Sequence, residues 1–300
     1  FRNKKKYRIV LVHGIWGFKT SICRLLVNNY AVFVHGSLHR SEFKKGYLKN
    51  LKKIIFWHLL EKRNLLESKF VILTSDKEKK SFYNTYFKTR NIKTKFFNYG
   101  ILENKIDSSK ACAVFKKKLP NFKSQSFYLY LGRVHPQKGC DILIRSMIDI
   151  KSKLLIMGNF SNDNYKNYLH KIIRENKMCN IVFAKADYSY LKWGALLECK
   201  ALVSATHGEN FGISLVEAMS CKKPVITTNK VNISDKIIND RAGIISSVNL
   251  KSFRSSIKKF EKFNSAFKVK MGKNAYKCFQ NNFDLKNSKN SLTEYIKHFT

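Results

Sequence analysis

Acidic residues are scarce in this chain of 300 residues, because 20 Asp and Glu stand against 58 Lys and Arg, for a net charge of +38. Proline is scarcer, and three residues of it argue against long disordered tracts. The apolar runs fall short of the ~18 residues that a membrane-spanning helix needs. The N-terminal run RIVLV is too short for a signal-peptide core, so no targeting segment is expected.

Cysteine shows no organised pattern. The seven cysteines are odd in number and scattered, and no C-x-x-C pair occurs among them. Neither a disulfide framework nor a zinc site is therefore predicted. A reducing, cytoplasmic setting fits this usage best.

The positive charge leaves three interpretations open: nucleic acid, an anionic membrane surface, or a solvated background of lysine. Lysines are spread along the whole chain, often as KK or KKK between apolar residues, which favours the background. No helix-turn-helix spacing, zinc knuckle or RNP-like aromatic strand appears, so no nucleic-acid partner is predicted.

The order of elements predicts an α/β protein. The length favours two domains of about 100–200 residues, and 23 Phe and 14 Tyr suffice for their cores. Short apolar strands alternate with amphipathic helical stretches, which is typical of mainly parallel, doubly wound sheets. The expected strands are 8–14, 30–36, 69–75, 94–100, 126–132, 153–158, 181–185, 201–206, 224–228 and 243–247.

The same alternation sets the expected domain limits. Residues 1–109 form the first domain and 110–285 the second, with a linker in 103–125 where the pattern weakens. A helix within 286–300 follows the completed second half and could cross back to the first. Ligands of such sheets bind beyond the carboxyl ends of the strands.

Two basic side chains share one loop of the second domain. In YLGRVHPQKGCDILIRSM, Arg133 follows a strand directly and Lys138 precedes a helix that begins near Asp141. Two cations beside a helix N-terminus are suited to phosphate. In so basic a chain, two surface cations without a role are the alternative.

Two carboxylates stand in the run HGENFGISLVEAMSCKKPVITT. Glu209 and Glu217 flank a segment with the character of a loop turning into a helix, which Pro224 ends. If the segment were helical throughout, they would lie roughly 12 Å apart, about the span from the sugar to the ribose of a nucleotide-sugar. A helix cap and an exposed helical residue are the alternative for these two acids.

Together these stretches resemble glycosyltransferase family 4, the group 1 glycosyltransferases of the GT-B fold. The resemblance rests on G-R-x-H-x-x-K-G (132–139), E-N-F-G…E (209–217), C-K-K-P-V-I-T-T (221–228) and, more weakly, D-R-A-G (240–243) and V-H-G (34–36). It implies two Rossmann-like domains facing across a cleft, with the nucleotide-sugar held mainly by the second. The family's opening strand and glycine-rich loop have no counterpart before Tyr7, so the first domain is expected to lack its first βα unit.

The resemblance also implies roles for the residues. Arg133 and Lys138 would neutralise the donor diphosphate, Glu217 would accept hydrogen bonds from ribose hydroxyls, and Glu209 would bind the transferred sugar. Backbone contacts to sugar and phosphates would come from Asn210, Phe211, Gly212 and Ile213. Cations and amides placed in advance stabilise the charge that grows on the leaving diphosphate, so no metal and no cofactor are expected.

A histidine of the first domain completes the candidate site. His35 follows the strand YAVFV, and His13 ends the preceding strand in the same way, so position alone does not rank them. Family members carry a comparable histidine facing the donor sugar, and this resemblance favours His35. A loop histidine without a role is the alternative.

The resulting hypothesis is a retaining, metal-independent hexosyltransferase. It would move a sugar from a nucleoside-diphosphate sugar to a glycan or lipid-linked acceptor in cell-surface polysaccharide or glycolipid synthesis. A sugar-nucleotide 2-epimerase of the same fold and a non-catalytic basic binding protein remain alternatives.

The stretch 43–67 bears on a membrane partner. Leu48, Leu51, Ile54, Ile55, His58 and Leu59 recur at helical spacing, and Lys45, Lys49, Lys52 and Lys53 fall on another face. Such a helix either covers the sheet of the first domain or holds a peripheral enzyme against the anionic inner face of the cell membrane.

Overall fold

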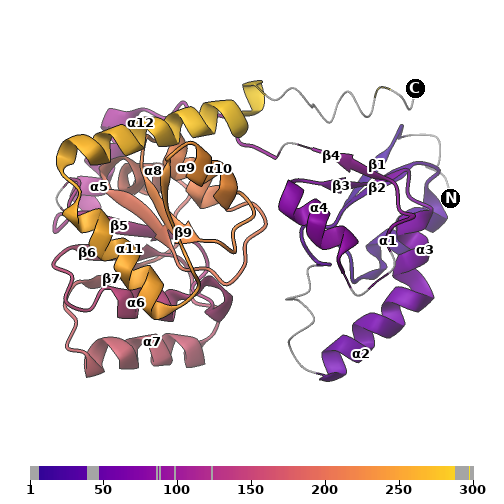
Figure 1. Cartoon of the computed structure of the whole chain (residues 1–300), viewed down its shortest axis with the longest axis horizontal. Helices are drawn as coiled ribbons and strands as arrows, with labels where there is room; N and C mark the ends of the chain where they lie inside the picture. The colour runs from indigo at the N-terminus through magenta and orange to yellow at the C-terminus, as the bar shows by residue number, and fades with distance from the viewer. Residues whose placement is uncertain are drawn as a thin grey trace. The chain divides into compact units, whose positions relative to one another are not determined.

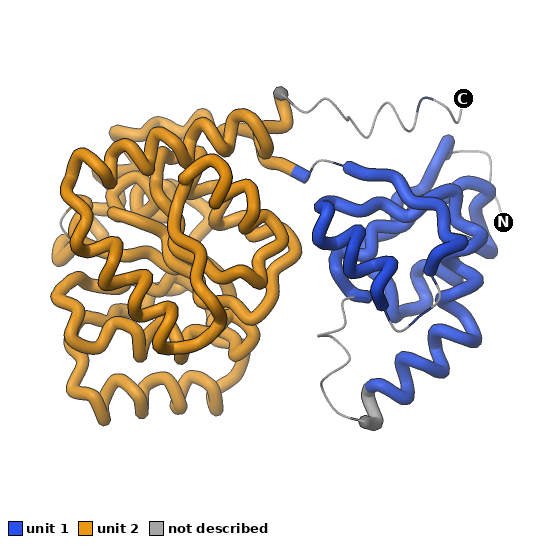
Figure 2. The backbone as a smooth tube through the Cα atoms, in the orientation of Figure 1, with its two compact units in different colours: residues 1–99, 288–300 blue, residues 100–287 orange. Residues whose placement is uncertain are grey.

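The computed structural model describes residues 7–38, 47–85, 87, 89–97, 99–122, 124–287 and 297. They form an α/β protein with two parallel sheets, as the alternating pattern predicts (Figure 1). The chain divides into unit 1, residues 1–99 with 288–300, and unit 2, residues 100–287 (Figure 2). None of the described helices is long and apolar enough to cross a membrane.

Unit 1 contains one sheet of four parallel strands, paired in chain order β1-β2-β3-β4. Its elements are β1 (Val10–His13), α1 (Phe18–Leu26), β2 (Tyr30–Phe33), α2 (Tyr47–Phe56), a π-helix (Trp57–Glu61), α3 (Lys62–Leu66), β3 (Phe70–Leu73), α4 (Asp76–Tyr83) and β4 (Thr94–Phe96). Side chains of β2 alternate between two buried clusters, because successive residues of a strand point to opposite faces.

Unit 2 contains a six-stranded parallel sheet in the order β10-β9-β8-β5-β6-β7. Its strands are β5 (Phe127–Leu131), β6 (Lys153–Met157), β7 (Ile181–Ala184), β8 (Ala201–Ser204), β9 (Val225–Thr228) and β10 (Gly243–Ser246). Its helices are α5 (Ser108–Lys118), α6 (Cys140–Ser146), α7 (Asp163–Glu175), α8 (Tyr190–Glu198), α9 (Ile213–Ser220), α10 (Ser234–Asn239), α11 (Leu250–Lys262) and α12 (Ser265–Asn282), with 3-10 turns at Pro136–Lys138 and Leu285–Asn287.

Several helices of unit 2 begin where the sequence supplies a capping side chain. Asn162, Asn249 and Asn264 each accept a hydrogen bond from the amide three residues on, at the starts of α7, α11 and α12. Such caps satisfy one of the amides that a helix start leaves without a partner. Helices α6, α7 and α11 cover one face of the sheet, and the remaining helices cover the other (Figure 1).

All ten predicted strands are present, although each is shorter at one or both ends than its apolar run. The expected linker 103–125 is wrong, because α5 occupies its middle and buries Ala111 and Phe115. Phe115 stacks on Phe127 of β5 with ring centroids 5.4 Å apart. The helix expected within 286–300 lies mostly outside the described residues.

The stretch 43–67 is helical from Tyr47 onward, and its first four residues lie outside the described residues. Trp57 and Leu65 are buried, whereas the apolar stripe faces away from the core: Ile54, Ile55 and Leu59 are 44%, 50% and 70% exposed. The stripe therefore does not cover the sheet of unit 1. Figure 1 shows α2 running away from that sheet, beyond the π-helix.

Candidate active site

The sheet of unit 2 reverses its strand order between β5 and β8, which is the switch point where doubly wound sheets bind ligands. A cavity of about 400 Å³ lies at this edge, beyond the carboxyl ends of the strands. Its lining comes from the segments that follow β5, β6, β7 and β8, and includes Gly132, Arg133, Lys138, Asn159, Asp187, Tyr188, Lys192, Glu209, Gly212, Ile213, Ser214 and Glu217. Six residues predicted from the sequence are thus brought to one cavity.

The loop after β5 places the two predicted cations. Nδ1 of His135 accepts a hydrogen bond from the amide of Gln137 at 3.1 Å and caps the 3-10 turn that carries Lys138. Gly139 follows with a φ of +64°, and a Cβ there would lie 2.1 Å from the carbonyl oxygen of Ala205. Only glycine permits this approach, so Gly139 fixes where Lys138 leaves the turn.

Lys138 and Glu209 form an ion pair through Nζ and Oε2, both partly exposed in the cavity. The backbone of Glu209 is held independently, because its amide donates to Lys230 at 3.1 Å and its carbonyl accepts from Asn232 at 3.0 Å. Glu209 precedes α9 in this extended segment, so it does not share the helix of Glu217.

The start of α9 points its free amides at the cavity. Its N-cap is Gly212, with a φ of +78° and no capping side chain. The amides of Ile213 and Ser214, in the first turn, lack helical acceptors by geometry, and both residues line the cavity. One turn further, Glu217 accepts from Nζ of Lys192 at 2.8 Å. The cavity therefore combines the amides at the start of α9 with cations and carboxylates. This set of groups is suited to a phosphate joined to a polyol.

Lys192 and Asp187 are site residues that the sequence analysis missed. Oδ1 of Asp187 accepts from the amide and the hydroxyl of Ser189, at 2.7 and 2.8 Å, and from the Lys192 amide at 3.3 Å. Burial alone would raise the pKa of Asp187, but these hydrogen bonds outweigh it and lower that pKa. A carboxylate in the loop shortly after a strand was a usable signal for Asp187, whereas nothing in the sequence sets Lys192 apart from the other cations.

Three predicted residues lie elsewhere. Asn210 and Phe211 do not line the cavity: the side-chain oxygen of Asn210 accepts from Asn232 at 2.7 Å, and the ring of Phe211 is 7% exposed and packs edge-on against Phe283. His35 belongs to unit 1, where it follows β2.

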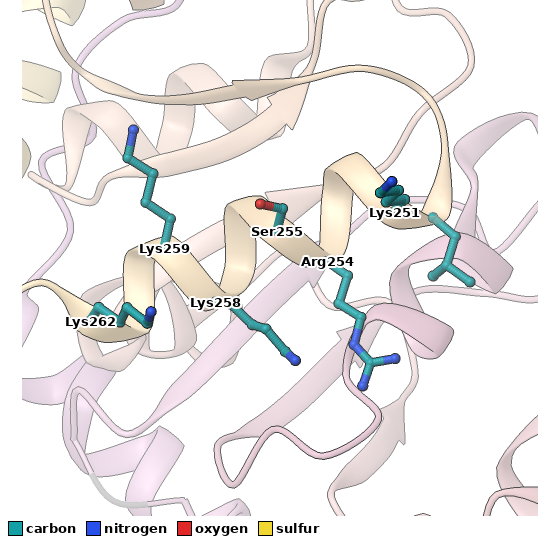
Figure 3. A pocket seen from close by; sticks show the side chains of 7 residues that line it. Lys251, Arg254, Ser255, Lys258, Lys259 and Lys262 are labelled. Atoms are coloured by element: carbon teal, nitrogen blue, oxygen red, sulfur yellow. The ribbon is translucent and has the colours of Figure 1, made fainter.

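A larger hollow of about 760 Å³ runs along α11 (Figure 3). All seven of its lining residues come from this one helix, and five of them are Lys or Arg. No second element contributes a group, so nothing converges on a ligand there. The cavity at the switch point is the better candidate.

The fold and this cavity define a protein of the GT-B class, whose solved members share its arrangement. Sucrose-phosphate synthase from Thermosynechococcus elongatus superposes with a TM-score of 0.79 at 19% identity, over 95% of this chain and 72% of that one. HepE of Anabaena, solved in complex with UDP, has a TM-score of 0.79 at 16% identity, over 99% of this chain and 80% of that one.

Residues 113–278 match the family of group 1 glycosyl transferases, and the chain belongs to that family. The capsular polysaccharide biosynthesis glycosyltransferase CapM of Staphylococcus aureus is 30% identical over 164 residues, which is 51% of this chain and 41% of that protein. An uncharacterized glycosyltransferase of Methanocaldococcus jannaschii is 29% identical over 136 residues, 45% of this chain and 38% of that protein. The matches thus span about two fifths of these relatives.

Proposed function

We propose that this protein transfers a sugar from a nucleoside-diphosphate sugar and that the cavity of unit 2 holds the donor. The observation that carries the proposal is the convergence of Arg133, Lys138, Glu209, Glu217 and the start of α9 on one switch-point cavity. The family of the chain and the fold it shares with HepE support the same assignment.

The donor diphosphate would bind at the start of α9 and the basic loop. As the bond from the anomeric carbon to phosphate breaks, negative charge grows on the diphosphate, and preplaced cations and amides lower the barrier. Lys138 is paired with Glu209 in the structure, so an arriving diphosphate competes for the same ammonium group. The exchange would release the carboxylate of Glu209 for hydroxyls of the transferred sugar.

The ribose would bind at Glu217. Its Oε1 pairs with Lys192, whose side chain is only 13% exposed, so the carboxylate is held in one position. Oε2 would then accept hydrogen bonds from the ribose hydroxyls. Lys192, which lines the same cavity, would orient Glu217 in this arrangement.

Retention of the anomeric configuration and independence of metal ions are further parts of the proposal. The diphosphate would be stabilised by the positive charges of Arg133 and Lys138 and by the dipoles of the α9 amides, which would take the place of a divalent cation. EDTA should leave transfer unchanged. Loss of activity with the chelator and its return with Mg²⁺ or Mn²⁺ would contradict this part.

We also propose a glycan or lipid-linked acceptor at the inner face of the cell membrane. CapM, a relative of the chain, is described as an enzyme of capsular polysaccharide biosynthesis. The exposed apolar residues of α2 and the π-helix, beside lysines, give unit 1 a surface suited to an anionic bilayer.

Calorimetric titration with UDP and GDP tests the donor site, and a screen of nucleotide-sugars with an acceptor extract follows it. Binding of a nucleoside diphosphate that is lost in Arg133→Ala supports the proposal, and Lys171→Ala, on the far helix α7, serves as the control. Absence of binding to either nucleotide would contradict a UDP- or GDP-linked donor and favour the non-catalytic binding protein. Conversion of the nucleotide-sugar itself, without an acceptor, identifies a 2-epimerase.

A further inference from the structure

Phe211 stands between Glu209 and Gly212 in the segment before α9, but its ring does not line the cavity. The ring is 7% exposed and meets the ring of Phe283 edge to face, with centroids 5.7 Å apart and planes 78° from parallel. Phe283 directly follows α12 and is 3% exposed. The segment that brings Glu209 and the start of α9 to the cavity is therefore packed against the end of α12.

Phe283 is itself fixed by backbone and side-chain contacts. Its amide donates to the carbonyl of Phe279 at 2.8 Å, and its own carbonyl accepts from the amide of Ile101 at 2.9 Å. The amide of Leu285 donates back to Ile101 at 3.1 Å, so the two segments form a short parallel bridge. Nζ of Lys236, in α10, lies 5.2 Å from the centroid of the Phe283 ring. These contacts leave Phe283 little freedom to shift.

Gly100 allows the two bridged segments to approach each other. A Cβ at this position would lie 2.3 Å from the carbonyl oxygen of Phe283, which is closer than a Cβ can come to a backbone atom. The chain enters unit 2 at Gly100, and helices α9, α10 and α12 pack together on one face of its sheet (Figure 1). A side chain at position 100 would therefore displace Phe283.

The segment before α9 has polar restraints as well, and they come from one residue. The carbonyl of Glu209 accepts from the amide of Asn232 at 3.0 Å, and the side chains of Asn210 and Asn232 are hydrogen bonded at 2.7 Å. Neither bond restrains the turn at Gly212, where φ is +78° and α9 begins. The ring of Phe211 is the buried side chain directly before this turn.

We propose that Phe283 is a positioning residue of the donor site and acts through Phe211. The contact of the two rings would hold the turn at Gly212, and with it the amides at the start of α9. Hydrogen bonds to a ligand require groups held within about 0.5 Å of their places, so a shift of this turn would weaken them. The inference rests on the proposed donor site and extends it to the end of α12.

Amide hydrogen exchange of the whole protein tests the positioning without any ligand. The reporters are the amides of Glu209, Asn232 and Leu215, which donate to backbone carbonyls at 3.1, 3.0 and 2.9 Å. Phe283→Leu keeps an apolar side chain but removes the ring, so these amides should exchange faster. Phe122→Leu is the matched control, because Phe122 is 5% exposed, packs on the aromatic ring that begins β5 and does not line the cavity. It should leave the three amides unchanged.

Calorimetric titration with UDP and GDP tests the effect on the donor site. Phe283→Leu should weaken binding about tenfold, which corresponds to the loss of one hydrogen bond to the nucleotide. Phe122→Leu should bind as wild type, because a residue that only stabilises the fold does not change the affinity of the folded protein. Gly100→Ala keeps both rings but displaces Phe283, so it should also weaken binding, and it replaces the Leu variant if that variant does not fold.

A double variant tests whether Phe283 acts through Phe211. Phe211→Leu combined with Phe283→Leu should bind no more weakly than the weaker single variant, since both changes remove the same contact. Additive losses, wild-type affinity in Phe283→Leu, or equal exchange of the reporter amides in Phe283→Leu and wild type would each overturn the inference. A wild type that binds neither UDP nor GDP would instead refute the proposed donor site, and the positioning role with it.

Discussion

Lys138 and Glu209 pair with each other across a sequence separation of 71 residues, one from the loop after β5 and the other from the segment after β8. The pair lies in the cavity at the switch point of the sheet, where a ligand of a doubly wound fold binds. In the proposed reaction a donor would need both groups separately, Lys138 for its diphosphate and Glu209 for its sugar. Donor binding would therefore require this ion pair to open.

The two glutamates should separate binding from turnover. Glu217→Ala should weaken UDP binding, because it removes acceptors for the ribose hydroxyls, whereas Glu209→Ala should mainly lower kcat. Loss of one charged hydrogen bond should cost about 1.5–3 kcal/mol, roughly tenfold to a hundredfold. Calorimetry and initial rates measure the two effects, with the exposed Glu175→Ala as a control. Wild-type binding and rates in both variants would contradict the donor-site assignment.

The basic loop should act on the leaving group. Arg133→Ala and Lys138→Ala should each reduce kcat by a factor of about a hundred or more, since both would neutralise charge that develops on the diphosphate. Circular dichroism should remain that of the wild type, because neither side chain is buried. Lys171→Ala should behave as wild type, because its pair with Glu175 is exposed and weak. Full activity in both cavity variants would exclude this loop from the reaction.

Unit 1 should bind anionic liposomes in a salt-sensitive manner. Each lysine near an anionic leaflet contributes on the order of 1 kcal/mol, so changing Lys45, Lys49, Lys52 and Lys53 to Gln should reduce sedimentation with vesicles that contain phosphatidylserine. A variant with Ile55→Ser and Leu59→Ser should also bind less, because both side chains are exposed.

Nucleotide binding should be unchanged in both liposome variants. Val269→Ser, which changes an exposed apolar residue of α12 in unit 2, is the matched control and should sediment as wild type. Equal sedimentation of the quadruple lysine variant and the wild type would show that these lysines do not bind the liposomes and are only part of the solvated positive charge.

Glu61 should make unit 1 less stable as pH rises. Burial raises the pKa of Glu61 from 4.5 to about 7, and hydrogen bonds from Thr20 and Asn64 offset only part of that rise. The folded state therefore favours the protonated acid, and the stability this contributes is present below pH 4.5 and lost as pH rises through about 7. The loss should be about 3 kcal/mol.

Urea unfolding at pH 5 and pH 8 measures this effect, followed by tryptophan fluorescence in a Trp193→Phe background that leaves Trp16 and Trp57 of unit 1 as reporters. Glu61→Gln should flatten the pH dependence, because its amide stays neutral. Glu67→Gln is the control of opposite sign: hydrogen bonding to Arg63 lowers the pKa of Glu67. Equal pH dependence in Glu61→Gln and the wild type would exclude Glu61 as its source.

The sequence by itself determined the strands, because each strand is a short apolar run whose period and flanking turns are local properties. It also pointed to Arg133, Lys138, Glu209 and Glu217, because these residues stand in short motifs that resemble those of group 1 glycosyltransferases, and all four line the cavity. The prediction of a linker at 103–125 failed. Most of α5 is lysine-rich and exposed, so the few apolar residues that it buries, among them Phe115, do not stand out in the sequence.

Only the tertiary structure decided which charges meet. Lys192 is one of 58 cations, and its pairing with Glu217 depends on where the fold places α8 and α9, which no local pattern encodes. The hydrogen bond between His13 and His35 likewise depends on the register of β1 against β2. The exposed apolar stripe of α2 has the same helical period as the buried stripe of a core helix. Whether such a stripe is buried depends on which elements pack against the helix, and not on the residues of the helix alone.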